Sequence, residues 1–247
     1  MSQRRRIGTA VLAALSAVTG LVLIATGGGV RPAAAATAPR RAGVDPANFV
    51  RTITNPYLPY RPGSVWVYTG VKDGQTQRDV VRVTHRTRMI MGVKATTVSD
   101  VATHGGKVLE QTTDWYAQDK QGNVWYFGEA TKARNPDGTF DTSGSWLTGV
   151  HGARPGIMMT AHPAVGDAHR QEFWRGHAED QYWLVELGAS VTVPAGSYSH
   201  AARTIEWSRL EPGVIDEKFY VPGVGVVKET AASGPKEVAT LARFTAP

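Results

Sequence analysis

Carboxylate side chains lie in or at the ends of segments that alternate like β-strands, where Asp and Glu are depleted unless they face water or a partner. If several face the concave side of a curled sheet, two of them could act as acid and base, because proximity raises the pKa of one. On the solvent face of a half-exposed sheet they need no function, and this alternative is favoured. The residues concerned are Asp114, Glu129, Glu172, Glu179, Asp180, Glu206 and Glu217.

Aromatic residues suggest binding, because they gather in strand-like segments between residues 115 and 207. Neighbouring strand residues point to opposite faces, so both faces carry aromatic area. One face belongs to the core, and the other lines a cleft for a small apolar or amphipathic ligand or lies under a loop. The predicted site combines an apolar wall with polar groups that orient the ligand. Its residues are Trp115, Trp125, Phe127, Arg170, Glu172, Trp183 and Glu217.

The sequence gives little indication of a metal site. Four histidines fall between residues 151 and 177, near Asp167 and Glu172, but no pair has the short spacing that fixes two ligands locally. The stretch 135–141 is typical of an Asp-Gly turn rather than of a calcium loop. No metal and no cofactor are therefore predicted. The histidines are His151, His162, His169 and His177.

Arginines occupy one face of the segment 77–86 and the residues just beyond it. They suit an anionic envelope polymer or lipid, or they protect the edge of a sheet from association, and the second interpretation is favoured. These residues are Arg78, Arg82, Arg86 and Arg88.

Common catalytic templates are missing from the sequence: it has no G-x-S-x-G elbow, no H-E-x-x-H pair, no phosphate-binding glycine loop and no dinucleotide fingerprint. The chain also has no cysteine, which excludes thiol nucleophiles, thiolate metal sites and disulfides. A binding protein is therefore favoured over an enzyme.

The elements that must position these side chains are strands. Val, Thr, Tyr and Trp alternate between Gly, Pro, Asn and Asp clusters, and no segment keeps a helical period for three turns. Residues 45–52 and the insertion described next are the places where a short helix is expected. The predicted strands are 65–71, 77–86, 93–102, 107–119, 124–129, 169–174, 181–186, 190–193, 201–207, 215–221, 225–229 and 238–244.

Residues 130–164 interrupt this rhythm with many Gly, Pro, Thr and Asn residues, as a lid or binding loop does. The predicted fold is all-β: a single curled antiparallel sheet of about eleven strands, a half-barrel or open barrel with one long irregular insertion.

The amino terminus carries an export signal. Arg4, Arg5 and Arg6 precede an apolar stretch and an A-x-A site before Thr37, which predicts a cleaved signal peptide over residues 1–36 and a secreted protein. Residues 37–48 are expected to form a flexible leader, and 49–247 a single β-domain. The alternative is an uncleaved anchor.

The charge balance depends on that cleavage. The chain has 27 basic and 21 acidic residues, and four of the arginines lie in 1–36, so the mature chain keeps 23 basic residues. Such a balanced surface does not favour nucleic acid as a partner. We expect a monomer without a membrane span after cleavage.

Five segments of the sequence are similar to motifs of known proteins. They are 62–68 (PGSVWVY), 114–119 (DWYAQD), 122–129 (GNVWYFGE), 193–198 (VPAGSY) and 220–228 (YVPGVGVVK). They resemble segments of a family of uncharacterised secreted bacterial proteins, and the last two are also similar to segments of TapB-like envelope proteins. The resemblance implies a curved sheet like that of lipoprotein and lipid carriers, and an envelope location. It implies no activity and no catalytic residues.

Three functions fit these observations. The favoured one is a secreted module that binds a small apolar or amphipathic ligand in its curled sheet, with 130–164 as a cover. The alternatives are an extracellular hydrolase with a carboxylate pair, which histidines could assist through a metal, and a structural or interaction protein of the envelope. The direction of the acidic side chains relative to the aromatic ones separates them.

Overall fold

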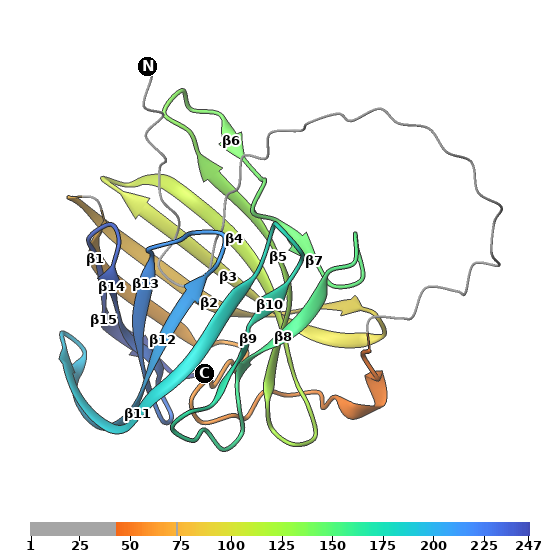
Figure 1. Cartoon of the computed structure of the whole chain (residues 1–247). Helices are drawn as coiled ribbons and strands as arrows, with labels where there is room; N and C mark the ends of the chain where they lie inside the picture. The colour runs from red at the N-terminus through yellow and green to blue at the C-terminus, as the bar shows by residue number, and fades with distance from the viewer. Residues whose placement is uncertain (1–42, 73) are drawn as a thin grey trace.

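The protein is described here from a computed structural model, which defines residues 43–72 and 74–247. The predicted signal peptide (1–36) and most of the predicted leader (37–48) lie outside these residues. The described part contains fifteen strands and one short 3₁₀ helix, η1 (Pro46–Asn48), so the all-β prediction is confirmed (Figure 1). The strands are β1 (Val65–Lys72), β2 (Gln75–Ile90), β3 (Val93–His104), β4 (Lys107–Gln118), β5 (Val124–Arg134), β6 (Phe140–Asp141), β7 (Trp146–Leu147), β8 (Arg154–Met159), β9 (Ala168–Arg170), β10 (Glu172–Phe173), β11 (Asp180–Val193), β12 (Gly196–Ser208), β13 (Ile215–Val221), β14 (Gly225–Ser233) and β15 (Glu237–Thr245).

All the pairings are antiparallel and form one sheet in the order β10-β8-β5-β4-β3-β2-β1-β15-β14-β13-β12-β11-β9. The first and last long strands, β1 and β15, pair over eight positions. At the other end of the order, β9 pairs with β11 while β10, two residues further on, pairs with β8. The segment 168–173 therefore bridges the two edges, and the sheet is a nearly closed barrel rather than a half-barrel (Figure 1).

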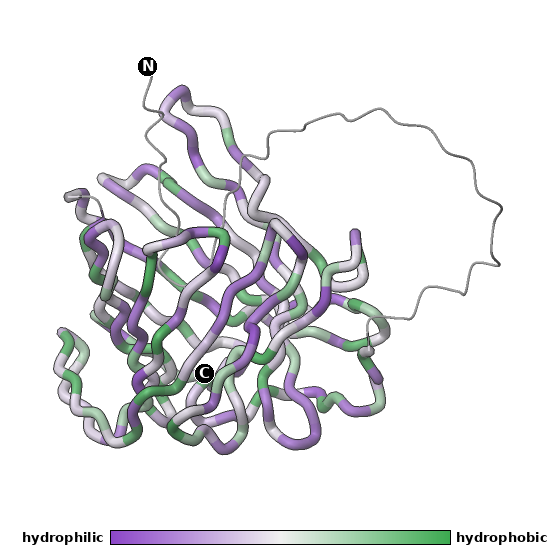
Figure 2. The backbone as a smooth tube through the Cα atoms, viewed as in Figure 1, coloured by the Kyte–Doolittle hydropathy of each residue, from purple (hydrophilic) through white to green (hydrophobic). Residues whose placement is uncertain are grey.

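Local sequence explains the strands. Hydrophobic and hydrophilic residues alternate along them (Figure 2), as expected for a sheet with two different faces. The turn between β2 and β3 has two residues with positive φ, Met91 at 51° and Gly92 at 85°, and only the glycine adopts such an angle without a steric cost. Gly70 in β1 is needed for another reason, because an added Cβ would lie 2.1 Å from the carbonyl oxygen of Val238 on β15.

Two differences from the expected elements concern the barrel wall. Residues 181–186 and 190–193 belong to one strand, β11, whose pairing with β12 contains three register shifts. Residues 130–164 are not only loop, since they hold the end of β5 and the strands β6, β7 and β8. Of these, β8 pairs with both β5 and β10 and is part of the wall.

The core has two parts. The larger part lines the barrel interior with aromatic and aliphatic side chains, among them Trp66, Tyr126 and Leu241. The smaller part lies on the outer face of β3 to β5, where Trp115 and Phe127 pack with Val44 and Phe49 from the N-terminal segment. We call this smaller part the outer cluster. Within residues 43–72 and 74–247, no helix is long and apolar enough to cross a membrane.

Candidate functional site: a carboxyl layer inside the barrel

The barrel interior carries a layer of acidic side chains that several strands contribute. Six of the seven strand carboxylates singled out in the sequence are buried, so the solvent-face interpretation is wrong for them; only Glu217 is half-buried. Four further acids, on β2, β3, β4 and β14, join the layer. Its buried members are Asp79, Asp100, Glu110, Asp114, Glu129, Glu172, Asp180, Glu206 and Glu229.

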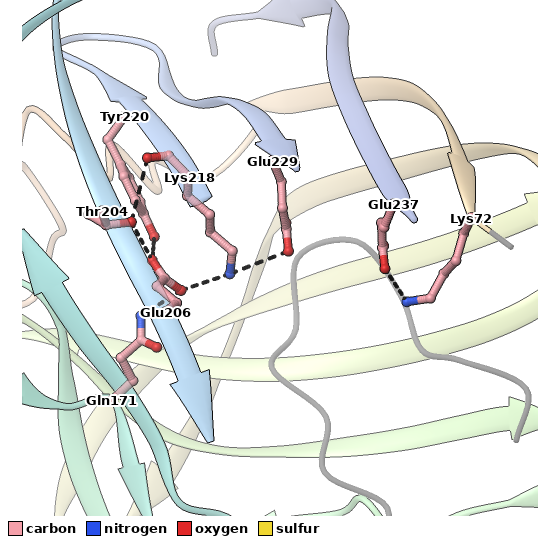
Figure 3. A network of polar contacts seen from close by, with 8 residues as sticks. All are labelled: Lys72, Gln171, Thr204, Glu206, Lys218, Tyr220, Glu229 and Glu237. Atoms are coloured by element: carbon pink, nitrogen blue, oxygen red, sulfur yellow. Dashed lines mark hydrogen bonds and ion pairs between the residues drawn. The ribbon is translucent and has the colours of Figure 1, made fainter. Parts of the chain in front are cut away.

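On β12 to β14, the layer is neutralised by the protein itself. Glu206 accepts hydrogen bonds from the hydroxyl groups of Thr204 (2.9 Å) and Tyr220 (2.8 Å) and from the amide of Gln171 (3.1 Å). Lys218 Nζ lies 2.9 Å from Glu206 Oε2 (Figure 3). Burial acts to raise the pKa of Glu206, but Lys218 and these hydrogen bonds hold it below its ordinary value. Glu206 is therefore a carboxylate at neutral pH.

Lys218 serves a second carboxyl group, since its Nζ also lies 3.9 Å from Glu229 Oε1. Burial acts to lower the pKa of Lys218, whereas Glu206 and Glu229 raise it above its ordinary value, so the ammonium form persists. Burial raises the pKa of Glu229 well above its ordinary value even though Lys218 opposes this. The Lys218 ammonium thus keeps Glu206 ionised but does not prevent the increase in the pKa of Glu229.

On β4 and β5, a tyrosine connects two acids. Tyr126 Oη lies 2.7 Å from Asp114 Oδ1 and 3.1 Å from Glu129 Oε2. A hydroxyl group has one proton, so it donates to one carboxylate while the other carboxyl group must be protonated to donate in return. Burial raises the pKa of Asp114 to about 7, and burial together with Asp114 raises the pKa of Glu129 well above its ordinary value.

A β-bulge places Glu129 in the interior. Asp114 pairs with Glu129 and Trp115 with Gly128, but Tyr116 pairs with Tyr126, so Phe127 is the additional residue. Without the bulge, Phe127 and Glu129 would share a face, because strand residues alternate. With it, Phe127 joins the outer cluster and Glu129 joins the layer.

Asp79 on β2 and Asp100 on β3 are the least satisfied members of the layer. Their carboxyl groups are close enough for one to hydrogen-bond the other when protonated. Burial raises the pKa of both, and for Asp100 the neighbouring Asp79 adds to the increase. Among the described residues, no donor reaches either side-chain oxygen of Asp79 or Oδ1 of Asp100 in hydrogen-bonding geometry.

The closing segment adds Glu172, and β11 adds Asp180. Burial and the charge of Asp180 raise the pKa of Glu172 well above its ordinary value. Glu172 Oε2 and the indole Nε1 of Trp146 are buried, and among the described residues neither atom has a partner in hydrogen-bonding geometry. The indole is nevertheless near enough to act against the increase in the pKa of Glu172. Burial raises the pKa of Asp180 to about 7. Electrostatic influence therefore continues from β4 and β5 across the seam of the barrel to β11.

Aromatic rings lie beside the carboxyl layer. Tyr60 packs edge-on against Trp66 and Tyr116, with ring centroids 5.6 Å and 5.0 Å apart. Tyr116 stacks on Tyr126 at 4.7 Å, and Tyr126 meets Trp146 at 5.3 Å. The interior thus has an aromatic surface and an acidic one.

The seven residues predicted to bind a ligand do not meet in one place. Glu172 lies in the layer, whereas Trp115 and Phe127 are buried in the outer cluster. Trp125 packs against that cluster and donates its Nε1 hydrogen to Asp119 Oδ2 at 2.8 Å. Three residues stay at the surface: Trp183 is 46% exposed, the Arg170 guanidinium is 3.7 Å from Glu179, and Glu217 is 2.9 Å from Arg203.

A pocket of about 530 Å³ lies outside the barrel between the N-terminal segment and the ends of β5 and β8. Its lining mixes two aromatic rings, an arginine and backbone of the N-terminal segment. The lining residues are Gly43, Val44, Asp45, Asn48, Phe49, Trp125, Arg154 and Pro155.

The remaining motifs have structural explanations. Asp137 Oδ1 accepts hydrogen bonds from the backbone N–H (2.9 Å) and the hydroxyl (2.6 Å) of Thr139, as in an ordinary turn. His151 and His177 both pack against Trp174, and no group of three metal-ligating side chains occurs in the part of the chain that the structure describes. The arginine-rich strand β2 lies between β1 and β3, so the edge-strand interpretation is wrong.

Asp79 and Asp100 were missed as candidate residues, although the sequence contains a signal for Asp79. It shares a strand face with Val81 and Val83, and an acidic residue on an otherwise apolar face has to be buried or to end that face.

Comparison with known proteins gives two similar structures. One is a predicted exported protein with a YmcC-like fold from Bacteroides fragilis, at 14% identity and a TM-score of 0.44. The other is a predicted lipoprotein from Parabacteroides distasonis, at 13% identity and a TM-score of 0.45. In each case the match covers 76% of this chain and 98% of the other.

No family model and no curated protein matches the chain, so the TapB-like resemblance is not confirmed. At TM-scores below 0.5, the two structural similarities carry no inference about ligand or activity.

Proposed function

We propose that the protein is a secreted binding module that holds a small amphipathic ligand inside its barrel. The observation that carries this proposal is the set of buried polar atoms of the interior that have no partner among the described residues. They include the oxygens of Asp79, Oδ1 of Asp100 and Oε2 of Glu172. Buried polar groups in proteins are nearly always hydrogen-bonded, so such atoms mark where a ligand group belongs.

The aromatic surface supports the second half of the proposal. Tyr60, Trp66 and Tyr116 present ring faces and edges beside the acidic groups, and small-molecule sites combine apolar walls with a few polar groups that fix orientation. An amphipathic ligand would place its apolar part against these rings and its polar part on the carboxyl layer. Of the residues predicted from the sequence, Glu172 belongs to this site.

The direct test is native mass spectrometry of the protein purified from the organism that encodes it, together with titration of the neutral fluorophore N-phenyl-1-naphthylamine. We expect a co-purified small molecule and a fluorescence increase. Val98→Phe, inside the barrel near Asp100, should abolish the increase, while Val71→Phe at a site that is 44% exposed should preserve it. Recovery of only the bare chain with no fluorescence response would refute the proposal.

A carboxylate-pair hydrolase is the second candidate, because Asp79 and Asp100 are close enough to share a proton. One protonated and one ionised carboxyl group are the acid and base that such chemistry needs. It predicts release of p-nitrophenol from p-nitrophenyl glycosides or esters, which Asp100→Asn would abolish and Glu186→Gln, on the outer surface, would not. Equal rates for both variants would exclude it.

A further inference from the structure

The interior carboxyl groups are compensated unequally on the two sides of the barrel. On β12 to β14, the ammonium of Lys218 lies between Glu206 and Glu229 (Figure 3). On β2 to β5, four of the buried acids face an interior to which β2, β3 and β4 contribute no Lys or Arg, because every Lys and Arg of these three strands is exposed. Within residues 43–72 and 74–247, these four acids therefore have no counterpart of Lys218. They are Asp79, Asp100, Asp114 and Glu129.

Two of these acids are buried and lack hydrogen-bond donors among the described residues. Asp79 is 1% exposed and Asp100 is 3% exposed, and three of their four side-chain oxygens receive no hydrogen bond from the described residues. Carboxylate oxygens only accept hydrogen bonds, so one carboxyl group can satisfy another only by keeping a proton. A group that carries several N–H donors and a positive charge satisfies both at once.

The nearest aromatic surface fits such a ligand. Tyr60 is 8% exposed, and its ring centroid lies 5.0 Å from that of Tyr116, which follows Asp114 by two residues on the interior face of β4. Burial and the charges of Asp114 and Asp100 raise the pKa of Tyr60. Ring faces attract cations, and the neighbouring Trp66 and Tyr116 extend the apolar surface.

We propose that the ligand is an organic amine whose protonated amino group binds between Asp79 and Asp100, with its apolar body beside Tyr60. This inference rests on the proposed function and names its ligand class. Lys218 is the precedent within the same fold, because it shows an ammonium held at 2.9 Å by a buried carboxylate of the opposite side. The external amine would compensate the carboxylates of β2 and β3 in the way that Lys218 compensates those of β12 and β14.

The test compares three ligands of one length by isothermal titration calorimetry at pH 7.5: hexylamine, hexan-1-ol and hexanoate. We expect hexylamine to bind at least tenfold more tightly than either of the others. The double variant Asp79→Asn/Asp100→Asn should weaken hexylamine at least tenfold and leave hexan-1-ol within about twofold, because Asn keeps the shape of Asp without its charge. Glu186→Gln, on the outer surface, should bind all three like the original protein.

Several outcomes would overturn the inference. Equal affinity for hexylamine and hexan-1-ol, or undiminished hexylamine binding by the double variant, would show that no ammonium site exists there. Calcium binding that excludes hexylamine would show a metal site in its place. Should the double variant not melt cooperatively, the three-ligand comparison on the original protein decides.

The same data separate this inference from the proposed function. If hexan-1-ol and N-phenyl-1-naphthylamine bind as well as hexylamine, the barrel binds ligands but not through an ammonium group. If none of them binds, both proposals fail together.

Discussion

Single residues of the interior combine stabilising contacts with buried charge. Asp114 accepts a hydrogen bond from Tyr126 and is 3% exposed, and burial raises its pKa from an ordinary 3.8 to about 7. A group whose pKa is raised on folding binds its proton more tightly in the folded state. Its stabilising contribution is therefore complete below about pH 4 and is lost as the pH rises through about 7.

Asp114→Asn removes this ionisation and keeps an acceptor for Tyr126. We expect the free energy of unfolding to increase by about 1 to 3 kcal/mol at pH 8, since each pKa unit corresponds to about 1.4 kcal/mol. At pH 4 the gain should disappear, because the carboxyl group is protonated in the folded protein. Urea unfolding at both pH values measures the difference, and an equal gain at pH 4 would show that the charge is not its cause.

Lys218→Met leaves Glu206 and Glu229 inside the barrel without their cation. Removing one partner of a buried ion pair costs about 3 to 5 kcal/mol. The free energy of unfolding at pH 7 should fall by that amount, and adding Glu206→Gln should recover part of it. Lys228→Met, at a half-buried site on the next strand, is the control and should change stability much less. A small effect of Lys218→Met would mean that water compensates both acids.

At the scale of elements, the seam of the barrel is sparsely paired. The closing segment is held by three pairs of β9 with β11 and two pairs of β10 with β8, whereas β3 and β4 pair at nine positions. Backbone amides that depend on few neighbouring bonds open at lower free energy.

Hydrogen exchange followed by mass spectrometry should therefore show faster exchange in peptides from 168–173 than in peptides from β3 and β4. A ligand that binds near Glu172 should slow exchange at the seam. Protection of 168–173 equal to that of β3 and β4 in the free protein would show that the barrel wall is uniform.

At the scale of the whole molecule, the carboxyl layer determines how stability depends on pH. Burial raises the pKa of Asp114 and Asp180 to about 7 and that of Asp216 to about 6, so the folded protein binds more protons than the unfolded chain between about pH 4 and 7. Glu206 acts in the opposite direction, because its lowered pKa stabilises the fold above about pH 4.5 and that contribution is lost below it.

Stability should consequently reach its maximum near pH 4 and fall toward pH 8. Melting temperatures measured from pH 4 to 8 test this, with Asp114→Asn expected to flatten the upper side of the curve. A melting temperature that rises steadily from pH 5 to 8 would mean that the layer is ionised and compensated in the folded protein.

The strand content and antiparallel order could be predicted because alternation and turn chemistry are local properties. Residues 65–71 and 215–221 match β1 and β13 to within one residue. The predicted number of strands is too low because β6 and β7 are only two residues long, β8 lies in the stretch predicted as an irregular insertion, and 169–174 contains parts of two strands, β9 and β10.

The binding residues could not be predicted in the same way, because they depend on register and closure. Phe127 and Glu129 share a face in a regular strand, and only the bulge opposite Tyr116 sends one outward and the other inward. Trp115 and Trp125 seemed to form a ligand wall, but the N-terminal segment covers their face.

The sequence by itself predicts an export signal, an all-β fold, and carboxylate and aromatic side chains on the strands, since these features depend on residue type and spacing. Only the tertiary structure decided which residues share the interior. Asp79, Asp100 and Glu172 come from three strands that meet because β1 pairs with β15 and the segment 168–173 joins β8 to β11. Their burial follows from the closed wall around them, a property that no single strand possesses.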